Sequence, residues 1–580
     1  MTTLAWLGWL LACRSPSGGL TTAPDTEDSA SSTTQSTSVV TLTSHTAGTS
    51  ATGAPTGESG SVPTNDTGTA TVVFDTAGPA CAGGGGDTGL IEVATPSQEP
   101  CTFVLPPSGA PGPVVRADDI VLATITGANG SGLGFALAAL GDTDGDGLGE
   151  LAIGRPGDFG GPGRYGKETQ GEVWVFAGGA LRGDLRRPDA TAILEGRVVN
   201  NQEASGQGWY LTAGDLTGDG LRDLVIGGRS YHPTMVVPLP VPAGVHIMED
   251  LVVASIDPPG GATLWNPAVG DVTGDGIPDL SLSGDATFGL TGGVTVFEGP
   301  LSTIAQDPED RWATYLMDER DDPYEVSQGQ ASGRYMMGVM FDVDGDGASE
   351  VVVGGDKLAN IQPSDGAATV QGGIGLFRGA ERSMPFGGEP GTQRSQHLVA
   401  LAYGECDARI GYETARVGDV SGDCRPDLAV GSSLFVLPGE LPRGAVYVVS
   451  EWHRARGDVP IQAISSATIV GEAPGEEVWS AGYLGDLNQD GYDDLAVGAP
   501  AAFGEGRVYI FLGPVQGTHL ASDADLVLAG SGGSFGYHLR GIFDVTGDGV
   551  VDLAVSAHST NDSDGKVYVF SGADLLAQMP

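Results

Sequence analysis

Residues 141–150 read GDTDGDGLGE and place four carboxylates within nine positions, at Asp142, Asp144, Asp146 and Glu150. Crowded like charges repel, so the segment is either a solvated acidic turn or a cation site. Oxygen ligands at alternating positions of a tight loop suit Ca²⁺, because zinc and copper favour His and Cys and Mg²⁺ retains more of its waters. The chemistry that this segment predicts is calcium binding.

The same spacing, D-x-[D/N/S/T]-x-D-x-x-x-[D/E], recurs six times downstream, with starts 56 to 77 residues apart. The further copies are residues 215–223, 271–279, 342–350, 419–427, 486–494 and 544–552. An EF-hand is excluded, because position 12 of that loop is a Glu whereas all seven copies have Ile, Leu or Val there. Metal-free turns are the alternative for individual copies.

We expect side-chain ligands at positions 1, 3, 5 and 9 of each copy and a backbone carbonyl at position 7. The predicted ligands are Asp142, Asp144, Asp146, Leu148, Glu150; Asp215, Thr217, Asp219, Leu221, Asp223; Asp271, Thr273, Asp275, Ile277, Asp279; Asp342, Asp344, Asp346, Ala348, Glu350; Asp419, Ser421, Asp423, Arg425, Asp427; Asp486, Asn488, Asp490, Tyr492, Asp494; and Asp544, Thr546, Asp548, Val550, Asp552. The first and fourth copies carry four carboxylates and should bind most tightly. The fifth is the most doubtful site, because Cys424 stands where the other copies have Gly.

Each acidic copy lies within a longer repeat. An aromatic residue precedes the copy by six or seven positions, and a short apolar strand such as LAIG or LAVG follows it. Most copies then have a β-rich run after Gly, such as GEVWVFAG, and the weaker AGVHIM at 243–248 is its counterpart in the second copy. Runs of β-branched and aromatic residues bounded by Gly, with few long segments of helical periodicity, predict an all-β fold. Seven such repeats predict a seven-bladed β-propeller of four-stranded antiparallel blades.

These repeats resemble the FG-GAP propeller, the fold at the head of integrin α chains and of many bacterial surface proteins. The resemblance covers roughly residues 113–577, with Gly134-Phe135 and Gly498-Ala499-Pro500 among its signature residues. It implies that repeats straddle blades, so that the strand near residues 119–125 completes the blade begun by the last copy. It implies a fold more strongly than a function, because propellers support unrelated activities.

Acidic residues outnumber basic ones 74 to 27, and the net charge of −47 argues against nucleic acid or an anionic membrane surface as partner. Residues 1–13 contain an apolar run suited to a signal peptide and end in a lipobox-like LLAC, so we expect lipidation at Cys13. No basic residue precedes that run, which leaves a truncated or cytosolic chain as the alternative. Residues 14–112 are low-complexity and predict a flexible tether.

Four further cysteines form two sequence-local pairs, Cys81 with Cys101 and Cys406 with Cys424. Disulfides at these pairs would agree with export, whereas free thiols are the alternative in a cytosolic chain.

The function that we expect is a lipid-anchored binding module at a bacterial outer membrane or cell surface. Up to seven structural Ca²⁺ ions would stabilise it, and variable loops would recognise an extracellular protein or glycan. The membrane would be touched only through the lipid. An enzyme acting on polysaccharide and a purely structural surface component are the alternatives; we expect no catalytic residues. Two Arg-Gly-Asp triplets, 182–184 and 456–458, and a G-x-S-x-G match at 532–536 are typical of short connections and turns.

Overall fold

The computed structural model describes residues 105–107, 109, 111–128, 131–157, 171–197, 206–228, 232–257, 264–284, 293–303, 312–315, 338–343, 345–355, 372–380, 398–404, 409–435, 441–559 and 564–580. All of them lie in the second of two compact units, Thr67–Pro580. The predicted signal segment 1–13, most of the predicted tether 14–112, and Cys13, Cys81, Cys101 and Cys406 lie outside the described residues.

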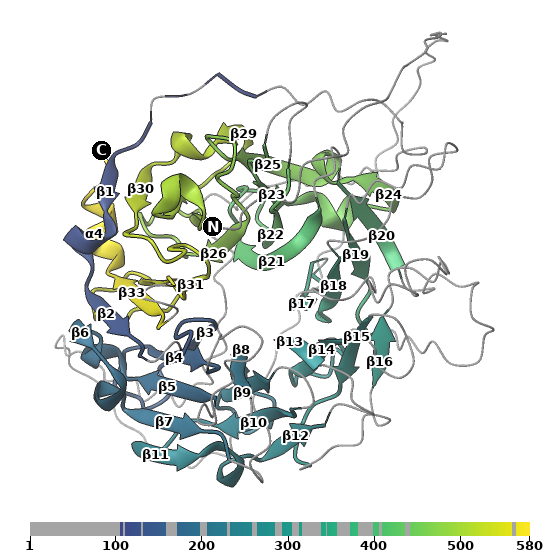
Figure 1. Cartoon of the computed structure of the whole chain (residues 1–580). Helices are drawn as coiled ribbons and strands as arrows, with labels where there is room; N and C mark the ends of the chain where they lie inside the picture. The colour runs from purple at the N-terminus through teal and green to yellow at the C-terminus, as the bar shows by residue number, and fades with distance from the viewer. Residues whose placement is uncertain are drawn as a thin grey trace, which may run out of the picture. The chain divides into compact units, whose positions relative to one another are not determined.

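Within this unit the described strands form seven sheets, the blades, which follow one another around a ring (Figure 1). Each blade is antiparallel over its first four strands. Blades one to three comprise β3 (Leu137–Gly141), β4 (Glu150–Arg155), β5 (Glu172–Phe176) and β7 (Ala192–Glu195); β8 (Gln207–Gly214), β9 (Asp223–Gly228), β10 (Thr234–Pro238) and β12 (Ala254–Ile256); and β13 (Leu264–Gly270), β14 (Asp279–Gly284), β15 (Gly293–Phe297) and β16 (Ala313–Tyr315).

Blades four to seven repeat this order from the innermost strand outward. They comprise β17 (Gly338–Phe341), β18 (Glu350–Gly355), β19 (Gly373–Phe377) and β20 (Leu398–Tyr403); β21 (Ile410–Gly418), β22 (Asp427–Ser432), β23 (Ala445–Val449) and β25 (Ser465–Val470); β26 (Ser480–Tyr483), β27 (Leu495–Ala499), β28 (Arg507–Phe511) and β30 (Leu526–Ala529); and β31 (Leu539–Gly541), β32 (Leu553–Ser556), β33 (Lys566–Phe570) and β2 (Ala123–Thr126). The predicted seven-bladed all-β propeller is confirmed.

Helical segments in the described ranges are short. The α-helices are α1 (Ala117–Ile120) and α4 (Gly572–Leu576), and the 3-10 turns are η2 (Gly178–Ala180), η3 (Arg187–Asp189), η4 (Met248–Asp250), η8 (Glu451–Arg454), η9 (Ile461–Ile464), η10 (Ala502–Gly504) and η11 (Ala521–Asp523). No helix among the described residues is long and apolar enough to cross a bilayer.

The hydrophobic core lies between the blades. Seven clusters of buried side chains each combine residues from two neighbouring blades; one of them joins Leu140 and Val175 of blade one to Leu224 and Met235 of blade two. A single blade could not bury its apolar faces alone, so each blade depends on both of its neighbours.

Interblade packing also explains the glycine that ends several of the second-strand motifs, such as LAIG and LAVG. A Cβ at Gly154 would lie 2.1 Å from the Gly208 carbonyl oxygen, and one at Gly498 would lie 2.2 Å from the Gly536 oxygen. Real Cβ atoms do not approach backbone so closely. The repeated glycine therefore lets the next blade's backbone pack directly on the sheet.

The first and last blades are closed by the N-terminal strands. β2 pairs antiparallel with β33, with Ala123 opposite Val569, as the FG-GAP resemblance implies. The strand begins later than expected, because α1 occupies Ala117–Ile120. A second closing strand, β1 (Val114–Arg116), pairs in parallel with β30 of blade six.

Several blades gain a fifth strand that belongs in sequence to the following blade. These parallel edge strands are β6 (Gly183–Leu185) on β2, β11 (Gly244–Ile247) on β7, β24 (Gly457–Pro460) on β20 and β29 (Gly517–Leu520) on β25.

The expectation that AGVHIM at 243–248 is the third strand of the second copy is wrong. That place is taken by β10, whose sequence TMVVP is flanked by proline-rich turns and lacks the Gly start of the other copies.

Candidate metal-binding loops

Every acidic segment joins the innermost strand of its blade to the second strand. In blade one, for example, β3 ends at Gly141 and β4 begins at Glu150. Because the inner strands all run in the same sense, the loops lie at one end of the inner strands, which we call the acidic face. The repeat therefore places seven equivalent loops on one face of the propeller.

The first carboxylate of each loop organises the turn. Asp142 accepts hydrogen bonds from the amides of Gly145 (2.7 Å) and Gly147 (2.9 Å). Equivalent bonds to positions 4, 5 or 6 are made by Asp215, Asp271, Asp342, Asp419, Asp486 and Asp544. Gly145 and Gly147 have φ of +81° and +91°, which explains why these positions favour glycine.

The ninth position is buried and tied to backbone. The Asp494 carboxylate accepts amide hydrogen bonds from Leu487 (2.8 Å) and from Gly513 (2.7 Å), the latter just after strand β28. Asp279 and Asp552 bond in the same way to Gly299 and Gly572. This side chain thus connects the loop to the third strand of its own blade.

Burial makes these carboxylates costly to ionise. It raises the pKa of Asp223, Asp279 and Asp552 to about 6 and that of Asp494 to about 7, although amide hydrogen bonds oppose the shift. A bound cation would reverse this trend, because it favours the ionised carboxylate.

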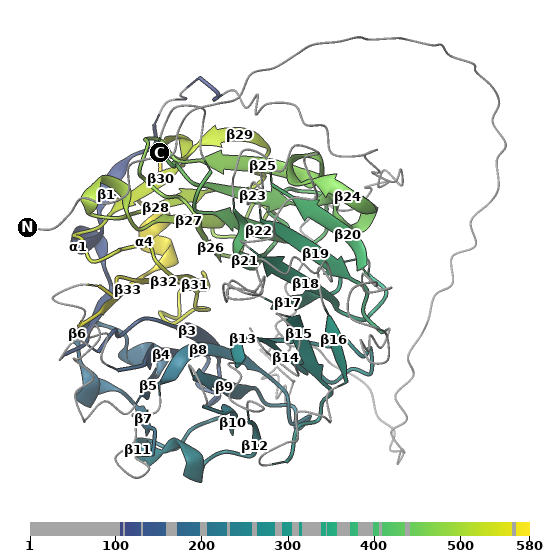
Figure 2. The ribbon, with the colours of Figure 1, turned by 45° about the vertical axis from the view of Figure 1, so that its right-hand side comes forward.

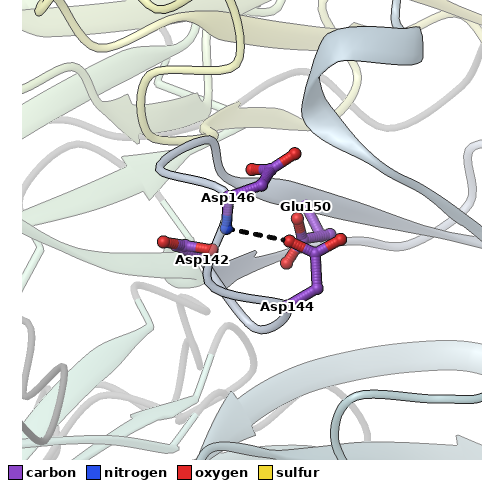
Figure 3. A group of neighbouring side chains, drawn as sticks. All are labelled: Asp142, Asp144, Asp146 and Glu150. Carbon is purple, nitrogen blue, oxygen red and sulfur yellow. Dashed lines mark hydrogen bonds between the residues drawn. The ribbon is translucent and has the colours of Figure 1, made fainter. Parts of the chain in front are cut away.

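The first loop brings its four predicted side-chain ligands together (Figure 3). One oxygen from each of Asp142, Asp144, Asp146 and Glu150 lies within 4.8 Å of the others. Glu150 is 4% exposed, and one of its carboxylate oxygens accepts hydrogen bonds from the Thr143 amide and hydroxyl at 2.6 Å. A buried carboxylate close to three exposed ones offers the oxygen ligands that a hard cation prefers.

The fifth loop differs from the first in burial. Asp419 and Asp427 are buried, and burial raises the pKa of both carboxyls, most strongly that of Asp427. Cys424 has φ +71° and is disulfide-bonded. Its predicted partner Cys406 lies outside the described residues, as does Asp344 of the fourth loop, so that pairing and that ligand stay predictions.

Three pairs of neighbouring loops are linked by backbone hydrogen bonds among the described residues. The amide at position 8 donates to the position 1 carbonyl of the preceding blade in Gly149 to Asp544 (3.0 Å), Ser349 to Asp271 (2.5 Å) and Asp493 to Asp419 (3.1 Å). The third and fifth loops have Pro278 and Pro426 at position 8, which have no amide hydrogen to donate. The Asp493 carboxylate also accepts the Asp419 amide at 2.7 Å. Sequence reasoning did not identify this role for position 8, because the residue type there varies from copy to copy.

The opposite ends of the inner strands carry aromatic side chains, and we call this end the aromatic face. Phe135 packs edge-on against Trp209 with ring centroids 4.3 Å apart, and Tyr537 contacts Trp479 at 5.0 Å and His558 at 4.1 Å. Trp479 departs from the repeat. The Trp479 amide donates to the Gly498 carbonyl, just as the Gly134 amide donates to the Gly154 carbonyl in blade one. Trp479 therefore occupies the position of Gly134, the glycine that precedes the repeat's aromatic residue and that we call the FG glycine.

The two Arg-Gly-Asp triplets occupy the same structural position. In each, Gly is the first residue of a parallel edge strand, β6 or β24, and has φ of +72° at Gly183 and +65° at Gly457. The edge strands β11 and β29 also begin with a positive-φ glycine. The positive φ at the start of the edge strand therefore explains why each triplet contains glycine.

The G-x-S-x-G match at 532–536 lies in the turn before β31 and is not followed by a helix.

Parts of the chain are similar in sequence to known proteins. The FG-GAP repeat family model matches residues 133–176 and 478–511. Human integrin alpha-IIb is 35% identical over 176 residues, which are 29% of this chain and 16% of the integrin, and human integrin alpha-7 is 32% identical over 209 residues, 33% of this chain and 17% of the integrin. The solved Dos1 propeller covers 78% of this chain and 95% of its own, with 9% identity and a TM-score of 0.37. This chain carries FG-GAP repeats, related to those of integrin α chains, on a seven-bladed β-propeller.

Proposed function

We propose that this protein is an exported binding module in which calcium stabilises the acidic face and the aromatic face and its loops recognise an extracellular protein or glycan. Lipid attached to Cys13 would anchor it, and residues 14–112 would hold the propeller away from the membrane. The ligand sets are those of the seven loops, with up to seven structural ions.

The observation that carries the metal assignment is the first loop. One oxygen from each of its four carboxylates lies within 4.8 Å of the others, and Glu150 is buried. The other six loops share its amide hydrogen-bond pattern, and their donor sets consist of oxygens. Calcium would supply the positive charge that these loops lack.

Calcium would act on neighbouring loops as well as on single ones. Asp271, Asp419 and Asp544 are predicted ligands at position 1, and their carbonyls also accept from the next blade's loop. Ordering one of these loops therefore favours the order of the loop that follows it. Because ions bind the folded chain and not the unfolded one, calcium adds stability by mass action.

The metal assignment is tested by equilibrium dialysis of the full chain against calcium, with bound metal measured by mass spectrometry. We expect several calcium ions per chain at millimolar calcium and little retention of magnesium. A Glu150→Gln variant should lose about one ion, and a Glu195→Gln variant, which changes an outer-strand carboxylate, should lose none. A chain that binds no calcium would contradict the assignment.

Anchoring and recognition need separate measurements. Metabolic labelling with palmitate should mark the chain in its native host, and a Cys13→Ser variant should be unlabelled and released. A pull-down from surface extracts in calcium should recover a partner that EGTA releases. A chain found unlabelled in the cytosol would contradict the export proposal without affecting the fold.

A further inference from the structure

A cavity of about 290 Å³ opens where blades five, six and seven meet. We call it the interblade pocket. Its walls come from the β22–β23 turn, the segment before β26, the turn after β27 and the turn before β31. The residues that the argument uses are Ser433, Glu477, Trp479, Ser534 and Tyr537. These turns belong to the aromatic face, so the pocket is separate from the metal-binding loops.

The pocket coincides with the place where the repeat is irregular. Trp479 stands at the position that glycine occupies in blades two, five and seven, at Gly208, Gly411 and Gly536. The carbonyls of these glycines pack on the second strand of the preceding blade, and the Trp479 carbonyl packs in the same way on Gly431. Two pocket residues that are not glycine, Glu477 and Ser534, have φ of +56° and +63°. Such conformations are uncommon outside glycine, and they concentrate at functional sites.

The lining offers an aromatic wall and a few polar groups. Trp479 and Tyr537 meet edge-to-face, with ring centroids 5.0 Å apart at 87°. The exposed Glu477 carboxylate has no hydrogen bond or ion pair with any described residue, and Ser433 and Ser534 add two hydroxyls. Aromatic rings pack against the C–H faces of a sugar, while a carboxylate and hydroxyls exchange hydrogen bonds with sugar hydroxyls.

Charge and size narrow the ligand further. A chain with a net charge of −47 repels anionic polysaccharides. The volume is at the lower limit for small-molecule sites, roughly 300 Å³, and suits one sugar ring better than a larger ligand.

We propose that the interblade pocket binds one uncharged pyranose residue of a glycan, with Trp479 and Tyr537 packing against the ring and Glu477 accepting hydrogen bonds from its hydroxyls. This inference rests on the proposed binding function and names its ligand class.

The test is saturation-transfer NMR with the full chain in calcium and a panel of uncharged methyl pyranosides. Lysine amide and arginine amide serve as cationic probes. We expect saturation transfer to at least one glycoside. Glu477→Gln should weaken that binding by about tenfold or more, because hydrogen bonds to charged groups are stronger than neutral ones. The matched control is Glu298→Gln, which changes an exposed carboxylate beside the acidic face.

Thermal melting of both variants checks that the propeller remains folded. Transfer that is lost or weakened in Glu477→Gln and kept in Glu298→Gln supports the proposal. No transfer to any glycoside, equal transfer in both variants, or transfer to the cationic probes alone would overturn it. If calcium binding and partner capture persist while glycosides fail, this inference falls and the proposed function stands.

Discussion

The two ends of the inner strands differ in how closely they repeat. On the acidic face, seven loops keep the same spacing and similar amide-to-carboxylate hydrogen bonds, and three neighbouring pairs are linked through backbone among the described residues. On the aromatic face, the FG glycine of blade six is replaced by Trp479 and a pocket opens beside it. Figure 2 shows the inner strands β3, β8, β21 and β26 that connect these ends. The difference indicates that the repeated end maintains the ring and the irregular end carries specificity.

The largest effect is expected from changing a glycine between blades. Gly498→Ala places a Cβ 2.2 Å from the Gly536 carbonyl oxygen, and rigid backbone on both sides prevents relief. Urea denaturation should show a loss of about 4 kcal/mol or more, or no folded protein. Gly475→Ala is the matched control: it has φ +86° but open space around it, and should cost only about 1 kcal/mol. Equal costs would mean that the blades are not in close contact there.

The next effect concerns the buried end of a metal-binding loop. Asp494→Ala leaves the amides of Leu487 and Gly513 without their acceptor, so we expect a loss of about 3 kcal/mol even in EGTA. Asn488→Ala, at the half-buried third position of the same loop, should cost less than about 1 kcal/mol in EGTA. If the two variants unfold alike in EGTA, position 9 has no structural role beyond metal binding.

Acid should stabilise the metal-free propeller. The folded pKa of Asp223, Asp279 and Asp552 is raised to about 6 and that of Asp494 to about 7, above the unfolded value. The folded state then binds more protons, so stability increases as pH falls from 8 to 5, by about 1 kcal/mol per group, and is lost as pH rises through the folded pKa. Melting scans in EGTA test this. In calcium the trend should flatten, and a trend that persists unchanged would argue against metal at these carboxylates.

The smallest effect on stability is expected at the pocket. Glu477→Gln changes an exposed side chain and should alter the free energy of unfolding by less than about 0.5 kcal/mol. Its predicted effect on glycoside binding is much larger. A large loss of stability would place Glu477 among the residues that maintain the ring.

Sequence reasoning was most successful where the chain repeats itself. Seven copies with one spacing predicted seven blades, and apolar position 12 placed each loop before a strand. The assignment of AGVHIM as a third strand was wrong. A parallel edge strand and a third strand both follow a glycine and both alternate apolar with other residues, so the two cannot be told apart from the sequence. Sequence reasoning also missed the displacement of Trp479. Trp479 is seven residues before Asp486, as Phe135 is before Asp142, and only the strand register shows that it replaces a glycine.

The central claim is that calcium at the acidic face maintains the ring, and melting temperature tests it most directly. The full chain should melt at a clearly higher temperature in millimolar calcium than in excess EGTA, and the difference should grow with calcium concentration. Magnesium at the same concentration should restore little of it. Identical melting in calcium and EGTA would contradict the account.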